Sequence, residues 1–280
     1  MDGSGIPVRQ GMPLPFSSVR GTAGRRLCVQ RRPPPWAAPA AAASNTWRAQ
    51  VIRFCRAPGS RRINGMTTPY WPLAGLRLAT PRLELRWPTP ADLDALASLA
   101  AGGVHDPGVQ PFANAWTEAS PADRAQSTLQ YHWQQWGAWK PADWSLNLVV
   151  VRDGEVVASQ GMRGRDYAVL REVGTGSWVG RDHHGQGIGT EMRAAVLHLA
   201  FEGIGARYAT SAAFEDNAAS LAVSRKLGYA DDGIERYFVS GRPVVSRRLR
   251  LDRAAWEAHR VTPVQISGLD ACQSYFGYTQ

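Results

Sequence analysis

Lysine is nearly absent from this chain: of its 32 Lys and Arg side chains, only Lys140 and Lys226 are lysines. Cysteine is also scarce, and the three cysteines have neither the spacing of a zinc site nor the number that a disulfide framework needs. No apolar run approaches the ~18–20 residues of a membrane-spanning helix. These absences argue against a membrane protein, a zinc protein and a disulfide-stabilised protein. They favour a protein of the reducing cytoplasm.

Positive charge is concentrated near the N-terminus. The net charge of +9 and the pI near 10 are typical of a protein that binds nucleic acid. Residues 1–65, however, hold eleven arginines and a single acidic residue, Asp2. The rest of the chain is therefore close to neutral, which argues against nucleic acid as the partner of the folded part.

Residues 1–65 are rich in Pro, Ala, Gly and Arg and keep neither helical nor strand periodicity, so we expect them to be disordered. Three origins are open: an arm that binds nucleic acid or the ribosome, an Arg-rich targeting peptide, or upstream DNA read as protein before a true start at Met66. The ordinary sequence after Met66 favours the last. We expect a folded domain over residues 66–260 and a C-terminal tail over residues 261–280.

From Arg82 onward, strand-like and helix-like segments alternate. Asp153-Gly154 predicts a two-residue hairpin turn, and a second hairpin is expected at Gly241-Arg242. Ser120, followed by proline, predicts the start of a helix. The expected strands cover residues 82–86, 145–152, 155–162, 172–180, 207–214, 235–240 and 244–252. Because hairpins flank a strand–helix–strand–helix unit, the pattern predicts an α+β fold whose sheet is not wholly parallel.

A glycine-rich stretch, HHGQGIGT, lies between a strand-like run and a strongly helical one, at residues 183–190. Free backbone N–H groups at the start of a helix, together with the positive end of the helix dipole, bind phosphate oxygens. A P-loop needs Lys and Ser/Thr after its last glycine, whereas Gly189 precedes Thr190 and Glu191. A dinucleotide fingerprint needs glycine or alanine at Thr190 and usually follows the first strand of a domain. A third pattern, R/Q-x-x-G-x-G/A, fits apart from its first position, which is His184.

Asp182 precedes this stretch directly and forms, with His183 and His184, an Asp-His-His order found in metallophosphoesterases. Neighbouring histidines rarely converge on one metal, and no further Asp/His cluster supports them. We therefore expect no metal site.

A second motif, FEDNAASLAVSRKLGY, covers Phe214 to Tyr229 and combines N-x-x-S with K-L-G-Y. With the glycine turn and the opening TPRLELR, it resembles the GCN5-related N-acetyltransferase (GNAT) superfamily, and in particular its ribosomal-protein-alanine acetyltransferase (RimJ/RimL-like) branch. The resemblance spans roughly residues 76–252. It implies the GNAT fold, with a mixed, mostly antiparallel sheet of six to seven strands and helices on both faces. It also implies acetyl transfer from acetyl-CoA to a primary amine, directly and without metal.

The resemblance implies a coenzyme A site along the glycine turn. The residues expected to bind the cofactor are Trp178, Val179, His184, Gly185, Gln186, Gly187, Ile188, Gly189, Thr190 and Asn217. Histidine is charged only part of the time near neutral pH, so His184 leaves most of the pyrophosphate recognition to backbone amides. Asn217 is a favoured helix cap and, in the family, also touches the cofactor arm. The sequence favours neither role over the other.

Two side chains are candidate catalytic residues. Many relatives protonate the leaving thiolate with a tyrosine four residues before the glycine of KLG, but that position is Ser224 here. Ser220 is the better candidate acid, and the alternative is a small residue that lets its helix approach the cofactor. Glu172 is the candidate base and Glu215 its alternative. If the amine loses its proton to bulk water, neither Glu172 nor Glu215 is needed as a base.

The expected acceptor is a protein N-terminus or a small amine. Six aromatic residues crowd the region before the first hairpin: Trp116, Tyr131, Trp133, Trp136, Trp139 and Trp144. Their spacing favours packing for most of them, and any that line a cleft suit an aromatic or cationic acceptor. Two alternatives to an enzyme are open: a non-catalytic acyl-CoA sensor, and a protein associated with the ribosome or nucleic acid through residues 1–65. The sequence also leaves open whether the protein is a homodimer.

Overall fold

The structure, a computed structural model, describes residues 70–277. Its strands are β1 (Arg77–Ala79), β2 (Glu84–Arg86), β3 (Asp143–Arg152), β4 (Glu155–Arg165), β5 (Glu172–Val179), β6 (Tyr208–Phe214), β7 (Ala230–Val239), β8 (Arg242–Asp252) and β9 (Gln265–Ser267). Its α-helices are α1 (Pro90–Gly102), α2 (Pro121–Gly137), α3 (Tyr167–Leu170), α4 (Ile188–His198), α5 (Ala218–Lys226) and α6 (Arg253–His259). The prediction of disorder for residues 1–65 lies outside the described residues.

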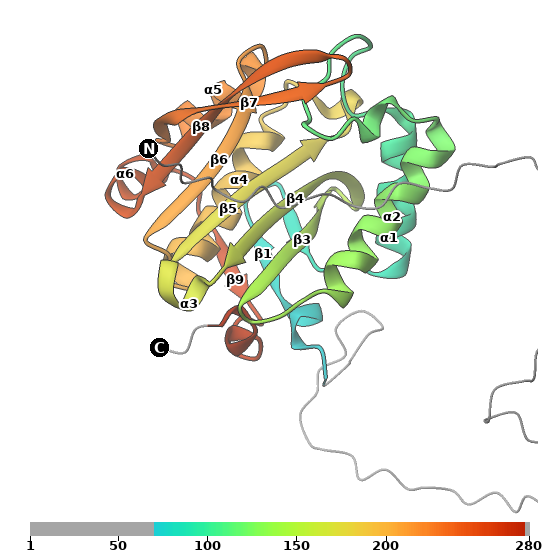
Figure 1. Cartoon of the computed structure of the whole chain (residues 1–280). Helices are drawn as coiled ribbons and strands as arrows, with labels where there is room; N and C mark the ends of the chain where they lie inside the picture. The colour runs from blue at the N-terminus through green and yellow to red at the C-terminus, as the bar shows by residue number, and fades with distance from the viewer. Residues whose placement is uncertain (1–69, 278–280) are drawn as a thin grey trace, which may run out of the picture. The chain divides into compact units, whose positions relative to one another are not determined.

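All nine strands form a single sheet in the order β7-β8-β6-β5-β4-β3-β2-β1-β9 (Figure 1). Every neighbouring pair is antiparallel except β5 and β6, which are parallel. The expected α+β fold with a mixed, mostly antiparallel sheet is confirmed, although the sheet has nine strands rather than six to seven.

The additional strands, β1 and β9, pair with each other at one end of the sheet. β9 comes from the segment that the sequence presents as a tail. Beyond it, Cys272 and Phe276 are completely buried, and the indole N–H of Trp144 donates to the carbonyl of Phe276 at 3.2 Å. The residues after Arg260 therefore complete this part of the sheet and close the core beneath it.

Both expected hairpins form. Asp153 and Gly154 have φ angles of 52° and 86°, the two positive values that a type I′ turn requires. The second hairpin turns at Ser240 and Gly241, with φ angles of 47° and 80°. The prediction of a turn at Gly241-Arg242 was therefore wrong by one residue, because Ser240 adopts the left-handed conformation despite its Cβ.

Helices cover both faces of the sheet (Figure 1). Helices α1 and α2 pack on one face, over β3 and β4, while α4 and α5 pack on the other, against β5 and β6. The main core includes Leu146, Leu148 and Val150, which alternate along β3 as residues on one face of a strand do. It also includes Val196 and Leu199, from α4 and the turn after it. The main core therefore lies on the face that α4 covers, and a smaller buried cluster that includes Leu96 of α1 lies on the other face.

The caps expected at two helix starts are present. The side chain of Ser120 accepts from the backbone N–H of Asp123 at the start of α2. Asn217 Oδ1 accepts from the backbone N–H of Ser220, at 3.1 Å, at the start of α5. The capping role of Asn217 is therefore confirmed, and it fixes where α5 begins after β6.

Candidate active site

β5 and β6 pair only at their beginnings. Their register joins Glu172 to Tyr208 and continues as far as Gly174 and Thr210. Beyond these residues β5 stays paired with β4 and β6 with β8, so the C-terminal halves of β5 and β6 separate. The sheet therefore has a split in its centre, where backbone groups of Thr175–Val179 that face β6 have no strand partner.

The glycine turn lies directly after this split, where β5 ends and α4 begins. Gly185 and Gly187 have φ angles of 73° and 79°, which glycine adopts without steric cost. Within the described part of the chain, the backbone N–H groups of residues 185–189 have no hydrogen-bond acceptor. Since these amides lie at the positive end of α4, they can donate hydrogen bonds to an anion.

Two arginines that sequence reasoning missed border the glycine turn. The Arg82 guanidinium forms a 2.6 Å ion pair with Glu191 and donates to the carbonyl of Gln186 at 3.1 Å. Arg152, at the end of β3, donates to the side-chain oxygen of Gln186. Glu191 is buried and its charge is matched by Arg82, so it does not repel an anion at the turn. Both arginines reach the turn through long-range packing, which no local motif reveals.

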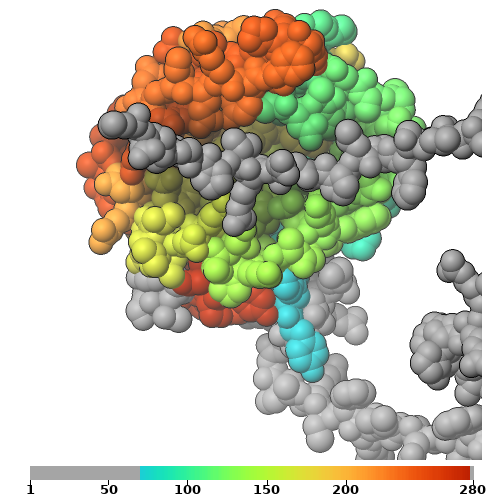
Figure 2. Space-filling view, viewed as in Figure 1, coloured from blue at the N-terminus to red at the C-terminus, as the bar shows by residue number. Residues whose placement is uncertain are grey.

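A cleft of about 1140 Å³ lies on the face of the sheet that carries α2. Its walls are α2 with the loop before it on one side and the β7–β8 pair on the other; in Figure 2 the orange β7–β8 pair and the green segment around α2 border this face. Gly161, Gly174 and Gly176 form its floor, and a Cβ on Gly176 would meet no atom within 4 Å. Ser177 and Ser211, on opposite sides of the split, also line it. The cleft therefore reaches the split.

The candidate base Glu172 lines this cleft together with Arg250. Its Oε2 lies 3.5 Å from the Arg250 guanidinium, which in turn lies 3.9 Å from the centre of the Tyr208 ring. The alternative base, Glu215, forms a 3.0 Å ion pair with Arg247 and is not among the residues that line the cleft. The geometry therefore favours Glu172 over Glu215 as a group that a cleft ligand meets.

Comparison with known protein families shows to which family this chain belongs. Residues 82–230, more than half of its length, match the family model "Acetyltransferase (GNAT) domain". The chain belongs to the GNAT family. The resemblance inferred from the glycine turn and the N-x-x-S…KLGY motif is thereby confirmed.

Solved structures agree with the GNAT fold. RimL, a ribosomal L7/L12 alpha-N-protein acetyltransferase, is 18% identical, with 63% of this chain and 97% of that chain covered and a TM-score of 0.51. RimJ from Mycobacterium smegmatis is 17% identical, with 72% and 95% covered and a TM-score of 0.50. A GCN5-related N-acetyltransferase from Brucella melitensis is 17% identical, with 66% and 81% covered and a TM-score of 0.52. At such identities the likeness concerns the fold.

His184, the irregular member of the GNAT turn, is engaged elsewhere. Its ring is exposed, and Nε2 lies 3.0 Å from the carbonyl oxygen of Val179, the last residue of β5. A bond to that carbonyl needs the Nε2 proton, so a neutral ring keeps only an unprotonated Nδ1. In this arrangement His184 fastens the end of β5 to the turn, and it donates to a phosphate only when it is protonated or rotated.

Ser220 and Ser224 lie one turn apart on α5. Ser220 is half-buried, and its hydroxyl has no hydrogen-bond partner within residues 70–277. Ser224 is completely buried; its hydroxyl donates to the carbonyl of Ser220 and accepts from Arg193, both at 3.1 Å. Neither serine lines the cleft. A role for Ser220 in proton transfer therefore requires a ligand that enters the split.

Several of the aromatic residues pack, as expected. Trp136 stacks on Trp87 with ring centroids 4.9 Å apart, and Trp139 stacks on Trp144 at 5.9 Å. Trp144 is buried, while Trp136 and Trp139 lie against the main core. These residues stabilise the fold and leave the cleft to others.

The remaining aromatic residues divide between the cleft and solvent. Trp116 and Trp178 line the cleft with their rings 5.9 Å apart. Tyr131 also lines it and donates from its hydroxyl to Asn147 Oδ1 at 3.3 Å. Trp133 is exposed and outside the lining. One wall of the cleft is therefore aromatic.

His132 is the most deeply buried titratable group of this cleft. It is 1% exposed, and its Nδ1 has no partner within the described residues. Burial lowers the pKa of His132 to about 4 because removal from water penalises the charged ring. The imidazole is therefore neutral near pH 7.

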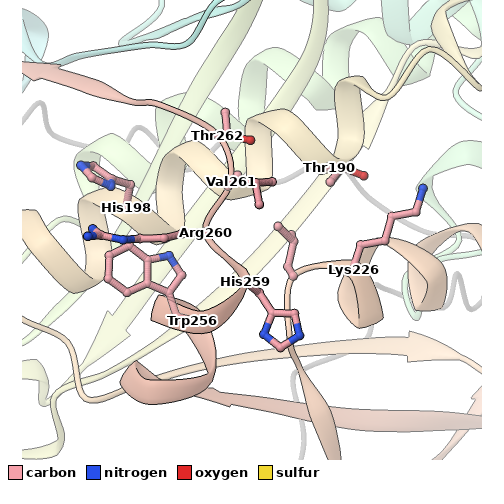
Figure 3. Close-up of a pocket in the computed structure, with 10 residues that line it drawn as sticks. Thr190, His198, Lys226, Trp256, His259, Arg260, Val261 and Thr262 are labelled. Atoms are coloured by element: carbon pink, nitrogen blue, oxygen red, sulfur yellow. The ribbon is translucent and has the colours of Figure 1, made fainter.

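A smaller pocket of about 280 Å³ adjoins the glycine turn. Its described lining residues are Thr190, Ala194, His198, Lys226, Leu227, Trp256, His259, Arg260, Val261 and Thr262, and none of them is acidic. Figure 3 shows Thr190 and Lys226 at one end of the pocket, and His198, Trp256 and Arg260 at the other. Lys226 forms no ion pair within the described residues. Its ammonium group is therefore available to an anion bound near the turn.

Within residues 70–277, no three His, Cys, Asp or Glu side chains are grouped to hold a metal ion. His183 instead lies 3.8 Å from Glu155. Among the same residues, no helix has both the length and the apolar character that crossing a membrane demands.

Proposed function

We propose that this GNAT domain transfers an acetyl group from acetyl-CoA to a primary amine by direct attack of the amine on the thioester. The carrying observation is that the free amides of residues 185–189 lie at the end of a split that opens into the cleft. A diphosphate joined to a long amide-containing arm fits such an arrangement. The RimL structure holds coenzyme A and the RimJ structure a CoA disulfide, which supports the same cofactor here.

The proposed cofactor site follows the turn and the split. The pyrophosphate binds the backbone N–H groups of Gly185, Gln186, Gly187, Ile188 and Gly189 and the hydroxyl of Thr190. Arg82 and Arg152, which contact Gln186, add positive charge beside it. The pantetheine arm lies along Trp178 and Val179, where backbone groups have no strand partner. The Asn217 end of α5 borders the other side of the split.

The proposed chemistry needs a hydrogen-bond donor for the oxyanion and a base that accepts the proton of the amine. The amine nitrogen attacks the thioester carbonyl carbon, and a free backbone N–H of β5 stabilises the oxyanion. Glu172 lines the cleft as an ion-paired carboxylate and takes the proton of the amine directly or through water. Ser220, whose hydroxyl has no partner among the described residues, is the proposed proton donor to the thiolate once the C–S bond has broken.

The proposed acceptor is a protein N-terminus or a small amine. The cleft is open enough for a chain end, and its wall carries Trp116, Tyr131 and Trp178. Aromatic faces attract cations and aromatic groups, and an amine supplies the cation before it loses its proton. RimL is a ribosomal L7/L12 alpha-N-protein acetyltransferase, which supports the first of the two acceptor types.

The test is calorimetric binding of acetyl-CoA to the full-length chain, followed by thiol release with a panel of amines. The panel should contain peptides with free N-termini, a polyamine and an aromatic amine. We expect saturable binding and amine-dependent thiol release. Tight binding without release for any amine would favour the non-catalytic sensor, and no heat at micromolar cofactor would refute the proposal.

A further inference from the structure

Arg193 of α4 is a buried cation without a counter-ion among residues 70–277. Its side chain belongs to a residue that is 5% exposed, and it forms no ion pair with any described residue. Its terminal nitrogens donate to Ser224 Oγ and Ser177 Oγ, both at 3.1 Å, while Nε has no partner within residues 70–277. Burying a guanidinium without a carboxylate costs several kcal/mol. The fold therefore places an unbalanced positive charge beneath the split.

The phenol of Tyr229, which interacts electrostatically with Arg193, does not neutralise it. Tyr229 is buried, and its hydroxyl lies 3.1 Å from Thr175 Oγ1. Burial raises the pKa of Tyr229, so the phenol keeps its proton. Burial lowers the pKa of Arg193, but a guanidinium stays charged in proteins. A positive charge is therefore present when a ligand arrives.

Ser177 connects this charge to the cleft. It lies on β5 beyond Gly174, the last residue paired with β6, and it lines the cleft. Because Ser177 Oγ accepts a hydrogen bond from Arg193, its own proton is available to a group in the split. A cationic donor also makes that hydroxyl a stronger hydrogen-bond donor.

A second buried polar atom lies beside Ser177 without a partner. Gln160 is directly opposite Ser177 across the β4–β5 ladder and is completely buried. Its Nε2 donates to the carbonyl of Gly176 at 3.1 Å, whereas its Oε1 has no partner within the described residues. Arg193 Nε and Gln160 Oε1 are thus two buried polar atoms that no described residue satisfies, as is expected where a further polar group binds.

We propose that Arg193, acting through the Ser177 hydroxyl, stabilises the thiolate that leaves when the thioester is cleaved. The inference rests on the proposed function. The C–N bond forms, the C–S bond breaks, and its electron pair stays on sulfur. The amine proton passes to Glu172 or to solvent, and the thiolate is protonated only after release. Ser177 donates a hydrogen bond to the sulfur without losing its proton, so Ser177 is the catalytic residue and Arg193 the positioning residue.

The test measures the pKa of the bound CoA thiol from thiolate absorbance as a function of pH, together with kcat and KM for acetyl-CoA. Arg193→Met keeps the volume and removes the charge, and Ser177→Ala removes the hydroxyl. Each variant removes or weakens one charge-assisted hydrogen bond to the thiolate, so we expect each to raise the pKa of the bound thiol by about one to two units. We expect kcat to fall ~10- to 100-fold, with KM within threefold of the wild-type value.

Two further variants make the result interpretable. Arg253→Met removes an arginine of α6 that contacts Phe201 and Glu202, away from the split, and should leave the thiol pKa unchanged. Arg193→Lys keeps the charge and should recover part of kcat. If Arg193→Met does not fold, Ser177→Ala alone tests the proposed hydrogen bond to the sulfur.

The two ways of failing are distinguishable. An unchanged thiol pKa in a folded Ser177→Ala or Arg193→Met chain that binds CoA would overturn the inference and make Arg193 structural. Absence of CoA binding by the wild-type chain would refute the proposed function itself.

Discussion

The Glu172 carboxylate of β5 and the Arg250 guanidinium of β8 lie 3.5 Å apart, although β6 separates their strands in the sheet. The guanidinium also lies over the ring of Tyr208, which is paired with Glu172. Both contacts hold the carboxylate in the cleft beside the strand split. A group in this position can receive a proton from an amine that attacks a thioester in the split.

Glu172→Gln tests this role, because the amide keeps the size of the side chain and cannot take the proton. General base catalysis contributes ~10²- to 10⁴-fold, so we expect kcat for thiol release to fall by that range. The affinity for acetyl-CoA should stay within threefold. Glu215→Gln, whose carboxylate pairs with Arg247 outside the cleft lining, is the control. Equal kcat in wild type and Glu172→Gln would mean that the amine loses its proton to water.

The glycine turn is tested by Gly187→Ala. At its φ of 79° a Cβ is strained, and it would lie 3.3 Å from the Arg82 guanidinium. Loss of one or two bonds to a charged phosphate weakens binding by ~1.5–3 kcal/mol each. We expect the Kd for CoA, measured by calorimetry, to rise at least tenfold. Gly154→Ala imposes similar strain at φ 86° with open space around it, and an equal loss of affinity there would contradict the site.

Lys226 tests where the 3′-phosphate of coenzyme A binds. Lys226 lines the small pocket together with Thr190, and the described lining contains no acid. We assign the 3′-phosphate of CoA to this pocket, so we expect Lys226→Glu to weaken CoA binding several-fold and to leave the binding of 3′-dephospho-CoA unaffected. The difference should shrink at 1 M salt, where charges are screened over ~3 Å. Lys140→Glu changes the only other lysine of the chain and should alter neither affinity.

Gly176 controls the depth of the cleft. A Cβ there would meet no atom within 4 Å, so a larger side chain fills space that we assign to the acceptor. We expect the acceptor KM to rise through the series Gly176→Ala and Gly176→Val, by at least tenfold for valine. The Kd for CoA should change less than threefold. An acceptor KM that does not follow side-chain size would place the acceptor elsewhere.

Local signals in the sequence predicted the elements that frame the site. The glycine turn, the Asp153-Gly154 hairpin and the Ser120 and Asn217 caps are each specified by a few neighbouring residues, and all are present. β9 was missed because three residues are too few to show a period, and its pairing with β1 is a long-range event. The strand count therefore came out too low although the fold was right.

The charged residues around the split show the limit of sequence reasoning more clearly. Arg82 reaches the turn from the β1–β2 connection and Arg152 from the end of β3, so their place depends on the whole sheet. Arg193 did have a signal. It stands four residues from Gly189 and from Leu197, on the face of α4 that packs inward. A charged residue on an apolar helix face is a candidate functional group, but its partners Ser177 and Ser224 were visible only in the fold.

His132 predicts how stability depends on pH. Its pKa is about 4 in the folded protein, because of burial, against an ordinary value of 6.5. The unfolded chain therefore binds a proton at a higher pH than the folded one, and stability falls as the pH drops from about 6.5 toward 4. Between pH 7 and pH 5 this ring should cost about 2 kcal/mol of unfolding free energy. Urea titrations at both pH values should show this loss in wild type and its absence in His132→Gln. An equal loss in the variant would assign the pH dependence to other groups.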